Sequence, residues 1–287
     1  MRTRLASTAA LLLPLAVLLV GCGSEPASRA QTTDSKSRAR EVAEAWDGSR
    51  AAEVWRQGYY PLADTVQLPK DAFHDEEDKE AYLNRNLVLD TELPTGSPQK
   101  GKVTWEGGGA LSLPLMAPDE AFRGVSGNEG DGPRLTVTAV KLGEASLLTS
   151  RGPATVPAWL FTLKGYDTPL KRVALAASQL PEPPIKPAGD TSDDLMDLAG
   201  LSSVSEDGRS VTVDAYHGAC DDGPRVHVLE TDGSVVLSAS IVGTSDGSCT
   251  SNLLSRKVTV KLESPLGDRV LLDAFAGAPV PQGRHVT

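Results

Sequence analysis

The fold is decided by one stretch of the sequence, SVTVDAYHGACDDGPRVHVLETDGSVVLSASIVG, which occupies residues 210–243. Apolar and polar residues alternate through 210–217 and again through 225–231, as they do in half-buried strands. The run SVVLSASIVG that completes the stretch follows directly after Asp232-Gly233, a strong signal for a tight hairpin turn. The stretch therefore predicts antiparallel β structure, arranged as a sandwich or as a small open barrel.

Strand-like runs continue on both sides of this stretch. KVTVKLE and RVLLDAF follow it, and the turn SPLGD separates them. Seven runs precede it between residues 64 and 178, namely DTVQLP, NLVLDTEL, KVTW, ALSLPLM, RLTVTAVKL, TVPAWLFTLKG and LKRVALAAS. The 20 Pro and 27 Gly favour many turns between short elements. We therefore predict a mainly β protein.

Helical spacing is confined to a small part of the chain. Apolar residues recur at this spacing from Val42 to Trp55 and predict a helix over about 38–57, with an interruption at Gly48 left open. A shorter helix is expected over 75–84, DEEDKEAYLN. Acids in a first turn are stabilised by the helix dipole, so this acidic cluster needs no ligand to explain it.

The larger aromatic residues gather in and after the first helix and in two strand-like runs. They are Trp46, Trp55, Tyr59, Tyr60, Trp105 and Trp159. We expect the tryptophans to pack the helix onto the first β domain. A surface that stacks on carbohydrate or contacts a partner is the alternative.

A proline-rich segment, PEPPIKP at 181–187, divides the chain. It is typical of a semi-rigid spacer or of a connection that follows the surface. We therefore predict an N-terminal helix plus β-rich domain over 40–180, a linker over 181–194, and an antiparallel β domain over 195–287. Both domains are expected to be antiparallel and sandwich-like.

The N-terminus has the features of a signal peptide. Residues 1–4, MRTR, are basic, and residues 5–20 are almost entirely apolar. A helix that spans a bilayer needs about 20 apolar residues, whereas this run is shorter and no basic cluster follows it. It ends in LVGC at 19–22, which resembles the lipobox of bacterial lipoproteins.

In that family the cysteine thiol receives a diacylglyceryl group, and a signal peptidase cuts just before the cysteine. The resemblance covers residues 1–22 and implies a signal peptide over 1–21 and a mature chain that begins at lipidated Cys22. It also implies a location at the extracytoplasmic face of the bacterial cell membrane, since two acyl chains anchor a protein stably. A plain secretory peptide with a chance cysteine is the alternative. Residues 22–39 are then expected to form a disordered tether.

The charge balance bears on the partners. The chain has 28 basic and 38 acidic side chains, a formal charge of −10, and no basic stripe that could neutralise the phosphates of nucleic acid. Removal of residues 1–21 takes away Arg2 and Arg4 and no acid, so −10 becomes −12. Anionic lipid repels such a body weakly, so we expect the anchor to hold it off the surface. A protein or glycan of the cell envelope remains as a partner class.

Two cysteines remain besides Cys22. Cys220 and Cys249 each lie beside an Asp-Gly turn, and the compartment outside the membrane permits oxidation. We therefore predict a disulfide between them. A redox or metal pair is the alternative, although the spacing is not that of a CxxC motif.

One segment matches a hydrolase motif. GTSDG at 243–247 fits the nucleophile-elbow pattern G-x-S-x-G, and Asp273 and His285 follow Ser245 in the order of a catalytic triad. An elbow joins a strand of a parallel sheet to a helix, whereas this segment lies between strands that look antiparallel. A Ser- and Gly-rich loop matches the pattern easily by chance.

A second set of residues could suggest zinc. His217 and His227 lie on successive predicted strands, where they could face each other across a hairpin near Cys220 and the carboxylates of Asp221 and Asp222. However, Asp-Asp-Gly is a common turn, and histidines on strands are usually packed or solvated. We assign no catalytic residue, metal or cofactor.

The composition of the body and the run WDGSRAAEVWRQGYYPL at 46–62 resemble lipoproteins of high-GC Gram-positive bacteria that have no assigned activity. No catalytic residue can be transferred from that resemblance. The favoured hypothesis is a membrane-anchored, non-enzymatic binding or interaction module of unknown ligand. The alternative is a cell-surface hydrolase or metal-dependent enzyme that uses Ser245, or His217 and His227.

Overall fold

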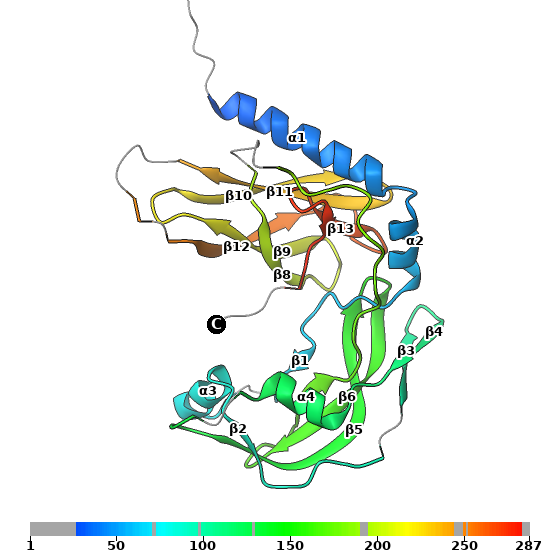
Figure 1. Cartoon of the computed structure of the whole chain (residues 1–287), viewed down its shortest axis with the longest axis vertical. Helices are drawn as coiled ribbons and strands as arrows, with labels where there is room; N and C mark the ends of the chain where they lie inside the picture. Colours follow the sequence, from blue (N-terminus) through cyan, green and yellow to red (C-terminus); the bar gives the residue numbers. More distant parts are fainter. Residues whose placement is uncertain are drawn as a thin grey trace, which may run out of the picture.

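The computed structural model describes residues 27–70, 73–96, 99–127, 130–189, 195–243, 249–250 and 252–282. They form two β-rich domains, which lie one above the other in Figure 1. The prediction of a mainly β protein is confirmed. The lower domain uses the middle of the chain, whereas the upper domain takes elements from both ends.

The first domain is a seven-stranded sheet accompanied by two helices. Its elements are β1 (Val66–Gln67), α3 (Glu76–Leu83), β2 (Leu87–Leu89), β3 (Lys100–Trp105), β4 (Ala110–Pro114), α4 (Pro118–Val125), β5 (Leu135–Thr149), β6 (Gly152–Leu163) and β7 (Leu170–Val173). Each of the seven predicted runs overlaps one of these strands. The acidic helix is α3, whose N-cap Asp75 accepts a hydrogen bond from the backbone N–H of Asp78 at 2.9 Å.

A long hairpin of β5 and β6 runs through the first domain. The two strands pair antiparallel along most of their length. At one end the buried Trp159 and Phe161 pack with residues of α3 and α4, and toward the other end Leu147 and Val156 pack with residues of β3. Helix α4 is not among the predicted elements, because it makes only two turns and its apolar pattern is short.

The second domain is a sandwich of two small sheets. Its elements are α1 (Ala27–Trp46), α2 (Arg50–Gln57), β8 (Leu198–Val204), β9 (Ser210–His217), β10 (Gly223–Glu230), β11 (Ser234–Val242), β12 (Leu254–Lys261), β13 (Val270–Asp273) and β14 (Ala278–Pro279). One sheet has the strand order β10-β11-β13-β14, and the other has the order β12-β9-β8. The structure thus has the sandwich and not the open barrel.

The hairpin predicted at Asp232-Gly233 joins β10 to β11, with Glu230 paired to Val235 beside the turn. On its other side β11 pairs with β13, and this pair is parallel. The chain reaches that arrangement because β12 crosses to the other sheet and pairs with β9 before β13 returns. The second domain, predicted to be antiparallel, therefore contains a parallel pair at this position.

Strand β11 is buried on both faces. Residues 234–239 are all buried, because the second sheet covers one face and α1 packs against the strand from the other side. Val42 and Trp46 of α1 are fully buried in this core, and the indole Nε1–H of Trp46 donates to the carbonyl oxygen of Gly277 at 2.8 Å. The second domain therefore has three layers, as Figure 1 shows.

The predicted place of the first helix is corrected by this packing. The helix was expected to pack on the first β domain, but Trp46 and Trp55 lie in the core of the second domain with Val213 and Leu237. The sequence does not indicate this arrangement, because α1 and α2 directly precede the first domain in the chain. The strands on which they pack follow only after the whole first domain.

Helix α1 also begins earlier than predicted. It starts at Ala27, so a large part of the segment 22–39, expected to be a disordered tether, is helical. The buried Ser35 and Ala39 continue the helical spacing of Val42 back toward the N-terminus. Serine and alanine are small and only weakly apolar, so this face produces no clear hydrophobic period in the sequence.

The predicted helix over 38–57 is interrupted at Gly48, a possibility that the sequence does not decide. Gly48 has a φ of +75°, a left-handed conformation that glycine adopts without the steric cost paid by other residues. Ser49 then caps α2, because its side chain accepts a hydrogen bond from the backbone N–H of Ala52 at 3.1 Å. The single predicted helix is therefore two helices with a sharp break.

The proline-rich segment follows the surface of the second domain. Ile185 and Ala188 pack against its core, and the backbone N–H of Ala188 donates to the carbonyl of Phe275 at 2.7 Å. Arg38 of α1 donates from Nη2 to the carbonyl of Lys186 at 2.6 Å. Of the two predicted readings of this segment, the surface-following connection is the one present.

Candidate functional site

Several of the residues considered for a site lie outside the described part of the chain. They are Cys22, with the preceding signal peptide, and Ser245 and His285 of the hydrolase motif. Among the helices that the structure does describe, none is both long and apolar enough to cross a bilayer.

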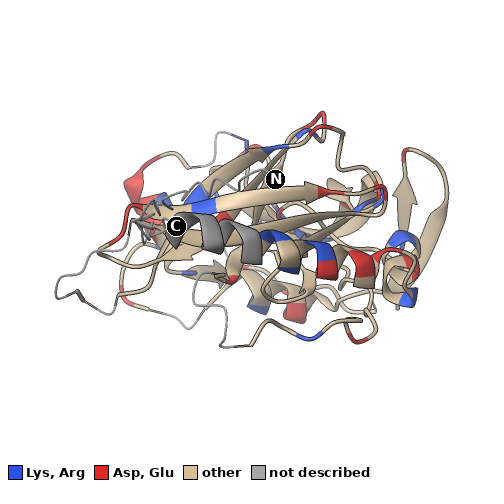
Figure 2. Cartoon of the chain, turned by 90° about the horizontal axis from the view of Figure 1, so that it is seen from above, with Lys and Arg blue, Asp and Glu red and all other residues tan. Residues whose placement is uncertain are grey.

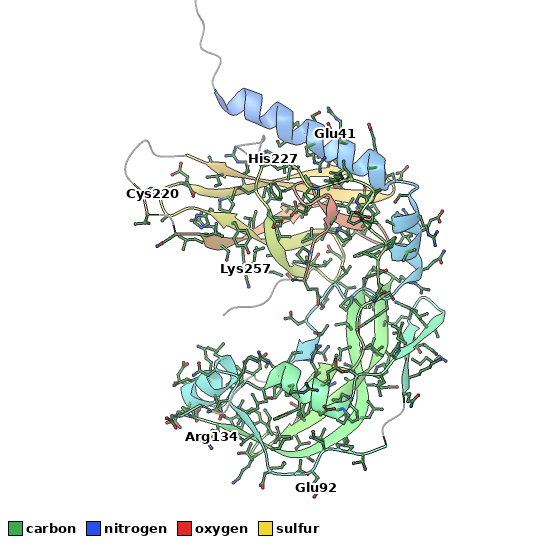
Figure 3. The ribbon with its side chains drawn as sticks, in the orientation of Figure 1. Glu41, Glu92, Arg134, Cys220, His227 and Lys257 are labelled. Atoms are coloured by element: carbon green, nitrogen blue, oxygen red, sulfur yellow. A yellow bond between two sulfur atoms is a disulfide. The ribbon has the colours of Figure 1, made fainter. Side chains whose placement is uncertain are left out.

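Cys220 and Cys249 form the predicted disulfide, with their Cα atoms 5.9 Å apart. Cys220 lies between β9 and β10, and Cys249 lies in the segment between β11 and β12. Figure 3 shows Cys220 at the end of the sandwich that points away from α2. The bond therefore ties together two connections at one end of the second domain.

The two histidines considered for zinc do not converge. His217 is buried, and its Nδ1 lies 3.1 Å from a carboxylate oxygen of Asp221, which also accepts hydrogen bonds from the backbone N–H groups of Gly218 and Gly223. His227 belongs to β10, which lies in a different sheet from β9, so the two histidines do not face each other across a hairpin, as the zinc alternative requires. Within the described ranges, no three His, Cys, Asp or Glu side chains are placed to hold a metal ion.

The prominent aromatic side chains are interior. None of the four tryptophans, nor Tyr59 or Tyr60, is more than 5% exposed, so they offer no stacking surface to a carbohydrate. Trp55 and Tyr60 stack on each other, with ring centroids 4.5 Å apart and planes inclined by 6°. This stack lies where the chain leaves the second domain for the first.

Asp273, which was weighed as a triad acid, is fully buried at the end of β13. Its two oxygens accept hydrogen bonds from the backbone N–H groups of Leu198, at 3.0 Å, and Phe275, at 2.8 Å. Burial, together with a hydrogen bond to the side chain of Asp197, raises the pKa of Asp273 to about 7. These contacts tie the start of β8 to the end of β13.

A hollow with charged walls lies between α1 and β10. We call it the α1–β10 groove, and its volume is about 220 Å³. It is lined by Ser35, Lys36, Ala39, Arg40, His227, Val228, Leu229 and Ser238. Figure 3 shows His227 close to α1, on the side of the second domain that faces away from the first domain.

The regular repeats of helix and strand place these side chains. Lys36 and Arg40 are four residues apart on α1 and so lie on the same side of the helix. Across the groove, His227 pairs with Ser238 in the register of β10 and β11. The hydroxyl of Ser238 donates to the carbonyl oxygen of Ser35 at 3.4 Å, which joins the helix to the floor of the groove.

Both burial and nearby positive charge affect the pKa of His227. Burial lowers this pKa below its usual value, and the positive charges of Arg225 and Lys36 lower it further. Arg225 precedes His227 by two residues on β10 and therefore lies on the same face of the strand. The imidazole of His227 is thus neutral near pH 7 and retains one N–H donor.

The cations of the groove are not neutralised by the acids that the structure describes. No described carboxylate forms an ion pair with Lys36, Arg40 or Arg225. The carboxylate of Glu41, which follows Arg40 in α1, pairs instead with Arg38 at 3.4 Å. Over residues 35–46 of α1, the basic positions precede the acidic positions, as Figure 2 shows from above. The groove is therefore suited to an anion.

The sequence prediction does not include this groove. Lys36 and Arg40 fall in or beside the segment expected to be a tether, and His227 is weighed there only as a metal ligand. Lys36 and Arg40 are four residues apart, a spacing that places two cations on one side of a helix and is visible in the sequence. The strand that forms the other wall of the groove lies almost 190 residues further along the chain, so the sequence does not show that the two walls meet.

In comparisons with known proteins, no protein-family model, no curated protein and no solved structure matched this chain. Inferences about its function therefore rest on its own residues.

Proposed function

We propose that this protein is a lipid-anchored extracytoplasmic lipoprotein that acts as a non-enzymatic binding module at the bacterial cell surface. The disulfide between Cys220 and Cys249 is the observation that carries the proposal. Disulfides persist in oxidising compartments and are rare in the cytosol. The bond thus supports the extracytoplasmic location that the lipobox resemblance implies.

The number of cysteines supports Cys22 as the lipidated residue. The chain has 3 cysteines, and the pairing of Cys220 with Cys249 leaves the thiol of Cys22 as the remaining one. Cys22 ends the LVGC motif and follows a basic start and an apolar run. A diacylglyceryl group on this thiol supplies the two acyl chains that stable anchoring requires.

The binding role is supported by how the chemically active side chains are used. The oxygens of Asp273 are engaged by backbone N–H groups, and His217 contacts the carboxylate that organises the turn after β9. The α1–β10 groove, in contrast, presents Lys36 and Arg40 without an ion-pair partner among the described carboxylates.

Fractionation of bacterial cells that express the wild type and Cys22→Ala tests this proposal. We expect the wild type in the membrane fraction, from which detergent but not salt releases it. The variant should be in the medium, or should be released from the membrane by salt. Ser24→Ala is a matched control, because it changes a neighbouring residue and keeps the thiol. The proposal fails if the Cys22→Ala protein stays with the membrane as firmly as the wild type.

A further inference from the structure

Helix α1 keeps the groove near the proposed anchor. Four residues, 23–26, separate Cys22 from the start of α1 at Ala27. The chain between Cys22 and Ala27 spans at most about 18 Å when fully extended. At about 1.5 Å per residue, Lys36 lies about 14 Å further along the helix. If Cys22 carries the lipid, the groove therefore lies within a few tens of ångströms of the headgroups.

The orientation of the molecule favours the same face. Figure 1 shows α1 lying along the outer face of the sandwich, with the first domain on the opposite side. Lys36 and Arg40 are exposed on this face, and Arg225 is exposed on the neighbouring strand. A membrane that approaches from the side of the N-terminus thus meets the groove before it meets the first domain.

The walls of the groove combine cations with apolar side chains. Val228 and Leu229 are half-buried and line the groove together with Lys36 and Arg40. A free phosphate ion offers only charged oxygens, whereas a phospholipid headgroup places a phosphate beside glycerol and acyl carbon. The apolar part of the wall therefore fits the lipid better than the free ion.

We propose that the α1–β10 groove binds the phosphate of an anionic phospholipid headgroup and so holds the α1 face of the second domain against the membrane, which rests on the location proposed above. Lys36 and Arg40 pair with the phosphate, and His227 donates a hydrogen bond. The net charge of −12 expected for the chain without residues 1–21 does not prevent this contact, because screening limits the repulsion from distant acids to about 10 Å at 0.1 M salt. For the α1 face of the second domain, this proposal replaces the expectation that the anchor holds the protein off the membrane surface.

Sedimentation with lipid vesicles tests the proposal. The mature chain with Cys22→Ala, which carries no lipid, is mixed with vesicles of phosphatidylcholine alone or of phosphatidylcholine with phosphatidylglycerol. We expect binding only to the anionic vesicles. Lys36→Ala combined with Arg40→Ala should weaken it about thirtyfold, because each basic residue near an anionic surface contributes about fivefold. Alanine favours the helix, so α1 should remain folded.

A matched control separates the groove from charge in general. Lys257→Ala combined with Lys261→Ala removes the same charge from exposed positions of β12. Figure 3 places Lys257 on the side of the sandwich that faces the first domain, away from His227. This control should bind as the wild type does. His227→Ala leaves the charge near pH 7 unchanged and should weaken binding about fivefold through the lost hydrogen bond.

Three results would overturn the proposal. The first is equal binding to both kinds of vesicle, and the second is an equal loss of vesicle binding in the groove variant and the control variant. The third is binding of inorganic phosphate, measured by calorimetry, that is as tight as binding to vesicles; this result would assign the groove to free phosphate. The assay uses protein without its lipid, so the groove can bind anionic vesicles even where fractionation shows that Cys22 is not an anchor. Conversely, an anchored protein can fail the vesicle assay.

Discussion

Asp273 shows how packing changes the chemistry of a single residue. Its carboxyl group is fully buried, and its pKa is raised to about 7, mainly by burial and further by the side chain of Asp197. In the unfolded chain the same group loses its proton near pH 4. The folded protein therefore binds more protons than the unfolded one between these values, and this residue lowers the stability as pH rises through them.

Asp273→Asn should remove this dependence. Relative to the wild type, the variant should gain up to about 4 kcal/mol in free energy of unfolding between about pH 4 and about pH 7. Loss of one backbone hydrogen-bond acceptor adds an offset that does not change with pH. Urea denaturation at several pH values measures the difference between the two proteins.

The matched control for this prediction is Asp232→Asn. Asp232 is exposed in the β10–β11 turn, and Asn-Gly suits such a turn as well as Asp-Gly does. Its pH dependence should equal that of the wild type. A constant difference between Asp273→Asn and the wild type from acid to neutral pH would show that the pKa of Asp273 is not raised in the folded protein.

The disulfide and the surroundings of Asp273 differ in how far the sequence could predict them. The pairing of Cys220 with Cys249 could be predicted because these two cysteines remain once Cys22 is assigned to the lipobox-like motif. The raised pKa depends on Asp197 and on a backbone N–H from β8, and no local pattern brings these groups to the end of β13.

At the scale of elements, the contact of α1 with the sandwich depends on Trp46. The side chain is fully buried, and its indole N–H is bonded to Gly277. Trp46→Ala should lower the free energy of unfolding by about 3–5 kcal/mol, because it removes a large buried side chain and leaves a cavity. Glu44→Ala, on the exposed side of the same helix, should change it by less than about 0.5 kcal/mol. Similar values for the two variants in urea denaturation would contradict the docking of α1.

The disulfide stabilises the hairpin that it encloses. Cys220 and Cys249 are 29 residues apart, and β10 and β11 lie between them. The double variant Cys220→Ser with Cys249→Ser should lose about 3–4 kcal/mol of stability on the chain-entropy model. A reductant should produce a similar loss in the wild type and no further loss in the variant. Cys22→Ser is the control, and its unfolding should respond to the reductant as that of the wild type does.

The elements differ in how visible they are in the sequence. The hairpin at Asp232-Gly233 is encoded locally, by alternation and turn residues, and it is found as predicted. Strand β8 is not among the predicted runs, because Gly200 and two irregularities in its pairing with β9 disturb the alternation. The start of α1 was missed because Ser35 and Ala39 become a buried face only against a strand far along the chain.

At the scale of the whole molecule, the sequence predicts two β-rich parts but not their connectivity. Trp46 and Gly277, which are 231 residues apart, are bonded to each other within the second domain. The first domain is therefore inserted between α2 and the proline-rich segment. This division of the chain depends on long-range contacts. The chain passes between the domains twice, and the proline-rich segment marks only the second passage.

The two crossings lie side by side. The backbone N–H of Ser178, on the returning chain, donates to the carbonyl of Tyr59, on the outgoing chain, at 2.8 Å. The tip of the β5–β6 hairpin adds a contact, since Arg151 donates to the carbonyl of Gln57 at the end of α2 at 3.1 Å. Helix α2 is thus bonded to the first domain, whereas α1 packs on the sandwich.

The intact mass of the protein extracted from bacterial membranes tests the central claim most directly. The account predicts a chain that begins at Cys22, with mass added that corresponds to at least a diacylglyceryl group on that residue. A chain that retains residues 1–21, or an unmodified chain that begins elsewhere, would contradict it.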